Sequence, residues 1–150
     1  MKHIRVAAII RHQNKILLHT TKNENYWTLP GGAVENELTK EGLQREMREE
    51  LGEEVTIREL KIIAENRFVY RGEEMDSIEF YYIVELYPNS ALLELSTFTK
   101  IEQFGQNGET DYELNFKWFE IDKVSEIEIL PKFLQTELTQ LSSDRIKHIQ

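Results

Sequence analysis

Alternating apolar and polar positions divide the first part of the chain into short extended segments. Residues 3–11 and 15–19 are rich in β-branched and other apolar side chains, and the polar pair Gln13-Asn14 separates them. This pattern is typical of two strands joined by a tight turn. We therefore predict a β-hairpin at the start of the sequence.

A helical pattern follows at residues 38–51, where good helix formers dominate. Asn36 or Thr39 can cap the first turn, and Gly52 stands where helices commonly end in a left-handed glycine. The segment before the helix, WTLPGG at residues 27–32, is predicted to be extended up to Pro30 and then to turn at its two glycines.

Strand patterns dominate the second half of the chain. Residues 55–64, 66–71 and 77–86 are predicted to be strands, the last two joined as an antiparallel hairpin. Residues 92–111 contain two glycines and are expected to include a long loop, and a further strand is expected at 114–121. Pro131 suits the first turn of a second helix, on which Leu134, Leu138 and Leu141 recur at helical spacing.

Strands interrupted by two helices predict an α/β fold, in which helices cover a mixed sheet to form a sandwich. The 150 residues are 40% hydrophobic, which is enough for one core, so we expect a single domain spanning residues 1–150.

Composition excludes several classes of function. The chain has no cysteine, which excludes disulfide frameworks and thiolate zinc sites and fits a cytoplasmic setting. Its formal charge of -9 repels the nucleic-acid backbone, so duplex DNA is not an expected partner. The apolar run at residues 6–10 is too short for a signal peptide or a membrane span, so no membrane association is expected.

Three carboxylates share one face of the predicted helix. At about 100° per residue, Glu46, Glu49 and Glu50 fall at relative angles of roughly 0°, 300° and 40°. A divalent cation would reverse the repulsion between them. Arg45 and Arg48 can relieve the repulsion instead, in which case the run is only an exposed charged face.

The residues around these acids favour a metal-binding face over a merely exposed charged face. Gly31, Glu37, Arg45, Glu46, Met47, Glu49, Glu50 and Gly52 fit the pattern G-x5-E-x7-R-E-U-x-E-E-x-G-U, where U is apolar. This is the box of the Nudix hydrolases, which the sequence resembles from residue 31 to residue 53. One position departs from the box, because Glu53 stands where the family has an apolar residue.

The resemblance implies a Nudix-type α/β/α sandwich and a metal-dependent hydrolase. Family members cleave a nucleoside diphosphate linked to another group, with Mg²⁺ or Mn²⁺ bound and water attacking phosphorus. The resemblance makes Glu46, Glu49 and Glu50 the metal ligands, with a backbone carbonyl at Gly31 as a further one. Glu46, Glu49 and Arg45 are the expected catalytic residues.

The resemblance also gives Glu37 a supporting role, in which it braces the loop against the helix. The identity of the group that takes the proton from water is left open, because family members use either the glutamate matching Glu46 or a carboxylate outside the box. Glu109 and Glu113 are the outside candidates.

A nucleotide-sensing binding module of the same fold, without turnover, is the alternative function. The sequence specifies neither the particular nucleotide-type substrate nor the phosphorus attacked. It also leaves the oligomeric state open, with a homodimer as one option.

Overall fold

The computed structural model of the protein describes residues 2–102, 112–141 and 144–150. The strands are β1 (His3–His12), β2 (Lys15–Thr20), β3 (Gly31–Ala33), β4 (Val55–Tyr70), β5 (Glu73–Leu86), β6 (Thr97–Glu102), β7 (Tyr112–Glu120) and β8 (Lys147–Ile149). The helices are α1 (Thr39–Leu51) and α2 (Leu134–Glu137), with 3-10 helices η1 (Ala91–Glu94) and η2 (Ile121–Glu126).

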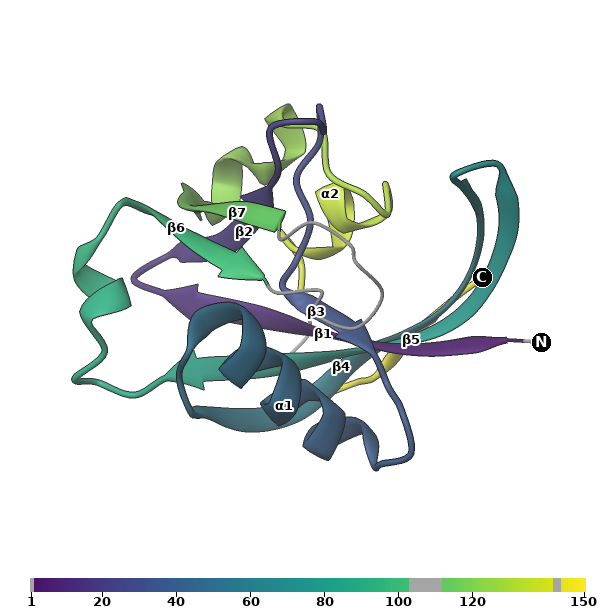
Figure 1. Ribbon diagram of the computed structural model, residues 1–150, viewed down its shortest axis with the longest axis horizontal. Helices are drawn as coiled ribbons and strands as arrows, with labels where there is room; N and C mark the ends of the chain where they lie inside the picture. The colour runs from purple at the N-terminus through teal and green to yellow at the C-terminus, as the bar shows by residue number, and fades with distance from the viewer. Residues whose placement is uncertain (1, 103–111, 142–143) are drawn as a thin grey trace.

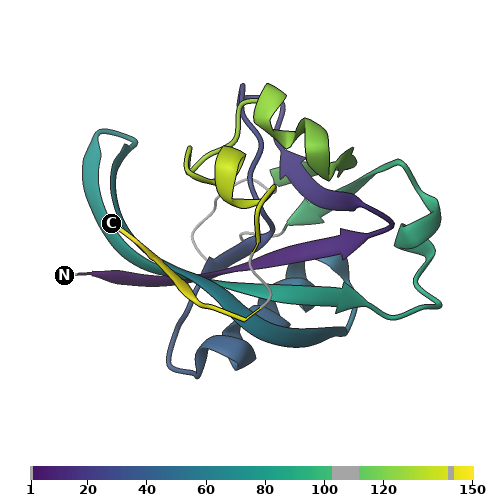
Figure 2. The same cartoon turned by 180° about the vertical axis from the view of Figure 1, so that it is seen from behind.

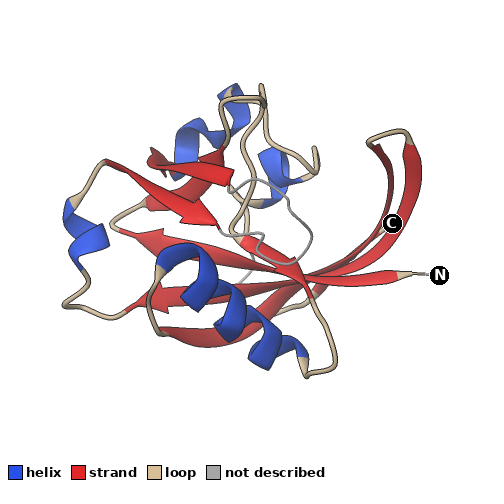
Figure 3. Ribbon diagram, viewed as in Figure 1, coloured by secondary structure: helices blue, strands red, loops and turns tan. Residues whose placement is uncertain are grey.

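The strands form a mixed sheet in the order β6-β7-β2-β1-β5-β4-β8, and β3 pairs with β1 beside this path. β1 runs parallel to β5 and β4 runs parallel to β8, whereas the other pairs are antiparallel. At its turn, the hairpin of β4 and β5 curves away from the rest of the sheet (Figures 1 and 3).

The sheet has a hydrophobic core on each face. Leu43, Met47 and Leu51 of α1 pack on one face together with Phe116 of β7. On the other face, Leu134 and Leu138 pack with side chains of β1, β2 and β5. Figure 2 shows α2 and η2 in front of the sheet and α1 behind it. The α/β/α sandwich with a mixed sheet, expected from the sequence, is therefore confirmed.

The N-terminal hairpin forms as predicted. β1 pairs with β2 in the register Arg11↔Ile16 and His12↔Lys15. Gln13 and Asn14 both adopt positive φ angles, 49° and 62°, which is the backbone geometry of the tight turns that match the twist of two antiparallel strands.

Helix α1 also forms as predicted, but neither proposed capping residue occupies the cap. Leu38 takes the N-cap position, Thr39 is already helical, and Asn36 lies outside the helix. The side chain of Leu38 cannot accept a hydrogen bond, so Glu41 stabilises this end by accepting the Leu38 N–H at 2.8 Å. Gly52 ends the helix in the left-handed conformation, as expected.

Residues 55–64 and 66–71, predicted to be two strands, belong almost entirely to one strand, β4, with irregular register near Leu60. The polar residue Asn66 does not break it. Its side chain donates to Glu79, and its carbonyl accepts from Ser77, so its polar groups are satisfied within the sheet.

Two other elements differ from prediction. The expected loop at 92–111 contains η1 and the edge strand β6, and its remaining residues 103–111 lie outside the described part of the chain. The expected helix after Pro131 shrinks to α2, of which Leu134 is buried. Among the described residues, no helix has the length and apolar character needed to cross a membrane.

The helix end at Gly52 gives a prediction. Its φ is +72° and no atom lies near the place of an added Cβ, so Gly52→Ala meets backbone strain and no clash. We expect this substitution to lower the free energy of unfolding by about 1 kcal/mol in denaturant titration. Gly52→Asn should lose less, because asparagine tolerates this conformation. An alanine variant as stable as the wild type would contradict the prediction.

Candidate active site

Two glycines let the strand β3 lie against its neighbours. A Cβ on Gly31 would lie 2.1 Å from the carbonyl oxygen of Val6 in β1. A Cβ on Gly32 would lie 2.4 Å from the carboxyl carbon of Glu46 in α1. The pair is therefore required by close approach on two sides, to β1 and to the acidic face of α1.

The outer edge of β3 faces the helix. The Gly31 N–H donates to Glu50 Oε2 at 3.1 Å, whereas the neighbouring Gly32 pairs with Val6 of β1. Because the N–H and C=O of one strand residue point to the same side, the carbonyl of Gly31 also faces the helix. This favours Gly31 over Gly32 as the residue that offers a backbone oxygen to a bound ion.

Three carboxylates, which we call the carboxylate cluster, gather next to this edge. Oxygen atoms of Glu46, Glu50 and Glu102 all lie within 4.8 Å of one another. Glu46 and Glu50 are only 7% and 3% exposed. Glu102 is the last residue of β6 and was not predicted from the sequence.

The third predicted ligand, Glu49, lies outside this cluster. Its side chain is 50% exposed, and its carboxylate lies 3.3 Å from the guanidinium of Arg45. The structure therefore brings together two of the three acids of the helix face and adds an acid from another element.

Arg45 connects the loop before the helix to the acids on the helix. Its guanidinium donates to Glu37 at 2.6 Å, to Glu46 at 3.0 Å and to the carbonyl of Ala33 at 3.0 Å. The Arg45 guanidinium lowers the pKa of Glu37, and the same pairing raises the pKa of Arg45. The geometry thus fits the expected roles, in which Arg45 orients a carboxylate and Glu37 braces the loop.

The cluster carries more negative charge than its surroundings compensate. Burial, followed by the charge of Glu49, raises the pKa of Glu46 to about 7, although Arg45 opposes this shift. Burial, followed by the charges of Glu102 and Glu46, raises the pKa of Glu50 well above its usual range. Burial and Glu49 also raise the pKa of Glu102. Such a group of acids is suited to a cation.

Of the two carboxylates proposed outside the box, only Glu113 can be placed, and it does not join the cluster. Glu113 is exposed on β7, and Glu109 lies outside the described residues. Alternation along β6 places Phe98, Lys100 and Glu102 on the less exposed face of that strand. The same alternation is visible in the sequence, but it indicates the position of Glu102 only once β6 is recognised as a strand.

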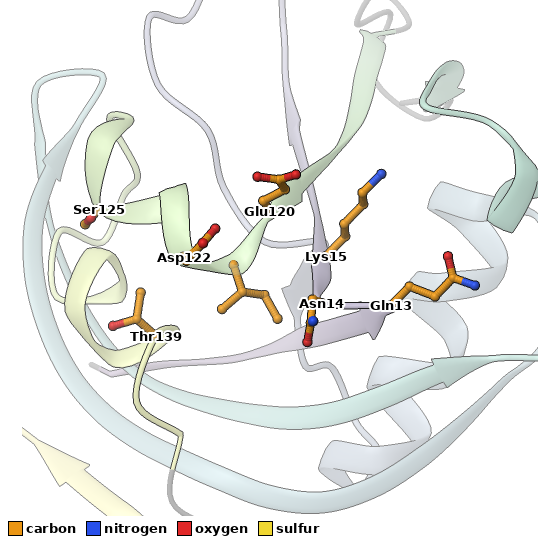
Figure 4. A pocket seen from close by; sticks show the side chains of 8 residues that line it. Gln13, Asn14, Lys15, Glu120, Asp122, Ser125 and Thr139 are labelled. Carbon is orange, nitrogen blue, oxygen red and sulfur yellow. The ribbon is translucent and has the colours of Figure 1, made fainter.

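A cavity of about 710 Å³ lies elsewhere, between the turn of the N-terminal hairpin and the start of η2 (Figure 4). Its lining includes Asn14, Lys15, Glu120, Asp122 and Thr139, none of which belongs to the carboxylate cluster. The candidate chemistry therefore lies at the edge of β3 and not in this cavity.

Gly42 gives a test of the Arg45 contacts. An added Cβ would lie 3.0 Å from Glu37 Oε1, the oxygen that Arg45 holds. Gly42→Ala gains about 1 kcal/mol of helix propensity, but we expect the displaced Glu37 to offset that gain and to reduce activity. In a Glu37→Ala background the same substitution should give the full gain in unfolding free energy. A single variant that is both more stable and fully active would contradict the expectation.

Comparison with known proteins supports the family resemblance that the box indicated. The NUDIX domain family model matches residues 1–136. Among solved structures, a UDP-X diphosphatase is similar over 100% of this chain and 68% of its own, with 20% identity and a TM-score of 0.62. An ADP-ribose pyrophosphatase from Streptococcus suis is similar over 100% of both chains, with 17% identity and a TM-score of 0.60.

A NUDIX hydrolase from Nitrosomonas europaea shares 22% identity over 99% of this chain and 78% of its own, with a TM-score of 0.62. At these identities the solved structures show the fold alone. No curated protein matches the sequence. The family model, which covers most of the chain, shows that this protein belongs to the Nudix family of pyrophosphohydrolases.

Proposed function

We propose that the protein hydrolyses the pyrophosphate bond of a nucleoside diphosphate linked to another group, with Mg²⁺ or Mn²⁺ bound at the carboxylate cluster. The observation that carries the proposal is the gathering of two buried carboxylates and one partly buried carboxylate at the edge of β3 where the Gly31 carbonyl faces them. A diphosphate is itself an anion, so a site of this charge would repel it unless a cation lay between them.

The donor atoms fit such an ion. Mg²⁺ and Mn²⁺ prefer oxygen ligands, and the site offers carboxylates of Glu46, Glu50 and Glu102 together with the Gly31 carbonyl. Glu49 is the predicted ligand that lies outside the carboxylate cluster, and its side chain is exposed, so its carboxylate is accessible from solvent. When bound, the ion would offset the charge of the phosphates and lower the pKa of a coordinated water.

The residues of the chain would then orient the reacting groups. Arg45 fixes Oε1 of Glu46 and leaves Oε2 without a hydrogen bond among the described residues. We assign the acceptance of the water proton to Glu46, because one of its oxygens is held and the other is available. Glu37, bonded to Arg45, keeps this arrangement in place.

Solved structures of the same fold suggest which substrates to test. Two solved structures of the same fold are described as a UDP-X diphosphatase and an ADP-ribose pyrophosphatase. A panel of UDP-sugars, ADP-ribose, dinucleoside polyphosphates and nucleoside triphosphates, each with Mg²⁺ or Mn²⁺, tests the proposal. The absence of turnover for every member would favour the nucleotide-sensing alternative.

Removal of one charge from the cluster tests the assignment of the site. Glu50→Gln and Glu102→Gln keep the side-chain size, and we expect each to lower kcat/KM by about 100-fold, since each would remove an anionic ligand. Glu54→Gln is the matched control, because Glu54 is exposed and pairs with Arg48 away from the cluster. Normal activity in Glu102→Gln, together with loss of activity in Glu49→Gln, would contradict this assignment. The metal ligands would then be the three acids on the helix face, as the sequence predicted.

Metal binding should also stabilise the folded protein. At a free Mn²⁺ concentration about 100 times its Kd, the free energy of unfolding should rise by about 2.7 kcal/mol through mass action. The rise in melting midpoint should be much smaller in Glu50→Gln. A wild-type midpoint that Mn²⁺ leaves unchanged would argue against a metal site in the free protein.

A further inference from the structure

An arginine lies on the sheet next to the candidate site and is not used by the site described so far. Arg5 of β1 pairs in register with Ala33 of β3 on one side and with Glu79 of β5 on the other. Directly paired residues place their side chains on the same face of a sheet. Arg5 therefore shares a face with Ala33 and Glu79, and its side chain is exposed.

The adjacent carboxylate does not hold this arginine. Glu79 is only 5% exposed, and its Oε1 accepts the hydroxyl of Tyr81 at 2.7 Å. Its Oε2 accepts the hydroxyl of Ser77 at 2.8 Å and the amide of Asn66 at 3.3 Å. Glu79 is thus satisfied by groups of β4 and β5 alone.

Arg5 is consequently left without a partner, since it makes no hydrogen bond or ion pair with any residue that the structure describes. Its charge still reaches the site, because it acts to lower the pKa values of Glu50 and Tyr81. In a protein with a formal charge of -9, a guanidinium that no described residue pairs, beside a group of acids, can attract an anion.

The strand between Arg5 and the carboxylate cluster carries almost no side chain. β3 consists of two glycines and Ala33, so no group larger than a methyl rises from this strand. A ligand that passes from the outer edge of β3 to Arg5 therefore meets no side chain of this strand larger than a methyl group, although Arg5 lies on the face of Ala33, opposite to the face on which Gly32 approaches Glu46.

We propose that Arg5 binds a phosphate oxygen of the substrate diphosphate, so that the diphosphate spans β3 from the carboxylate cluster to the guanidinium. The planar fork of arginine suits two oxygens of one phosphate. This inference rests on the proposed function, and it adds a substrate-binding residue that lies outside the box.

Binding of methylenediphosphonate, a diphosphate that cannot be hydrolysed, tests the inference without turnover. With Mn²⁺ present, Arg5→Gln should weaken its Kd by about 10- to 100-fold, the loss expected for a hydrogen bond to a charged group. Arg5→Lys should lose less, because it keeps the charge. Arg11→Gln is the matched control, since Arg11 is an exposed arginine further along the same strand and should leave binding unchanged.

Two further measurements separate this role from an indirect one. The Kd of Mn²⁺ alone should be no weaker in Arg5→Gln than in the wild type, and for any panel substrate KM should rise while kcat changes little. If Arg5→Gln binds methylenediphosphonate normally, or lowers kcat at an unchanged KM, the inference is wrong. Weakened Mn²⁺ binding would also overturn it, because Arg5 would then act through Glu50.

Failure of the proposed function would look different. A wild-type protein that binds methylenediphosphonate with Mn²⁺ but turns over no panel substrate would refute hydrolysis, and the comparison of Arg5 variants would still decide this inference. A wild-type protein that does not bind methylenediphosphonate would refute the subsite.

Discussion

The close approach of α1 to the outer edge of β3 is the constraint on which the rest of the site depends. Glu46 packs where a side chain on Gly32 would stand, and Glu50 accepts the N–H of Gly31. Leu43, Met47 and Leu51 fix the helix from the opposite side by packing in the core. Hydrophobic burial of one side of α1 therefore offsets the free-energy cost of holding carboxylates close together on the adjoining side of the same helix.

That cost is visible in the acids themselves. Glu46 and Glu50 are buried beside each other and beside Glu102, and their raised pKa values record the penalty of charge in this environment. Arg45 relieves only part of it, because its guanidinium bonds to Glu46 and to acids outside the cluster. A fold selected for stability alone would have no reason to place a third carboxylate, from β6, at the same point.

The sequence was informative where the interactions are local. The tight turn at Gln13-Asn14 and the helix ending at Gly52 depend on residues within a few positions of one another, so pattern and propensity predict them. The box likewise lies within one loop and one helix. The capping residue was missed because Glu41 reaches back to a backbone N–H, which makes a side chain that can cap at position 38 unnecessary.

Glu102 shows why the remainder was beyond prediction. Its neighbours in the cluster lie more than fifty positions earlier in the sequence, and only the docking of the edge strand β6 beside α1 brings them together. No local propensity encodes that contact. The acids of the cluster therefore depend on the sequence in two ways. Glu46 and Glu50 are aligned by one helix, so a contiguous segment is enough to position them. Glu102 comes from a separate strand, whose position depends on the pairing of the whole sheet.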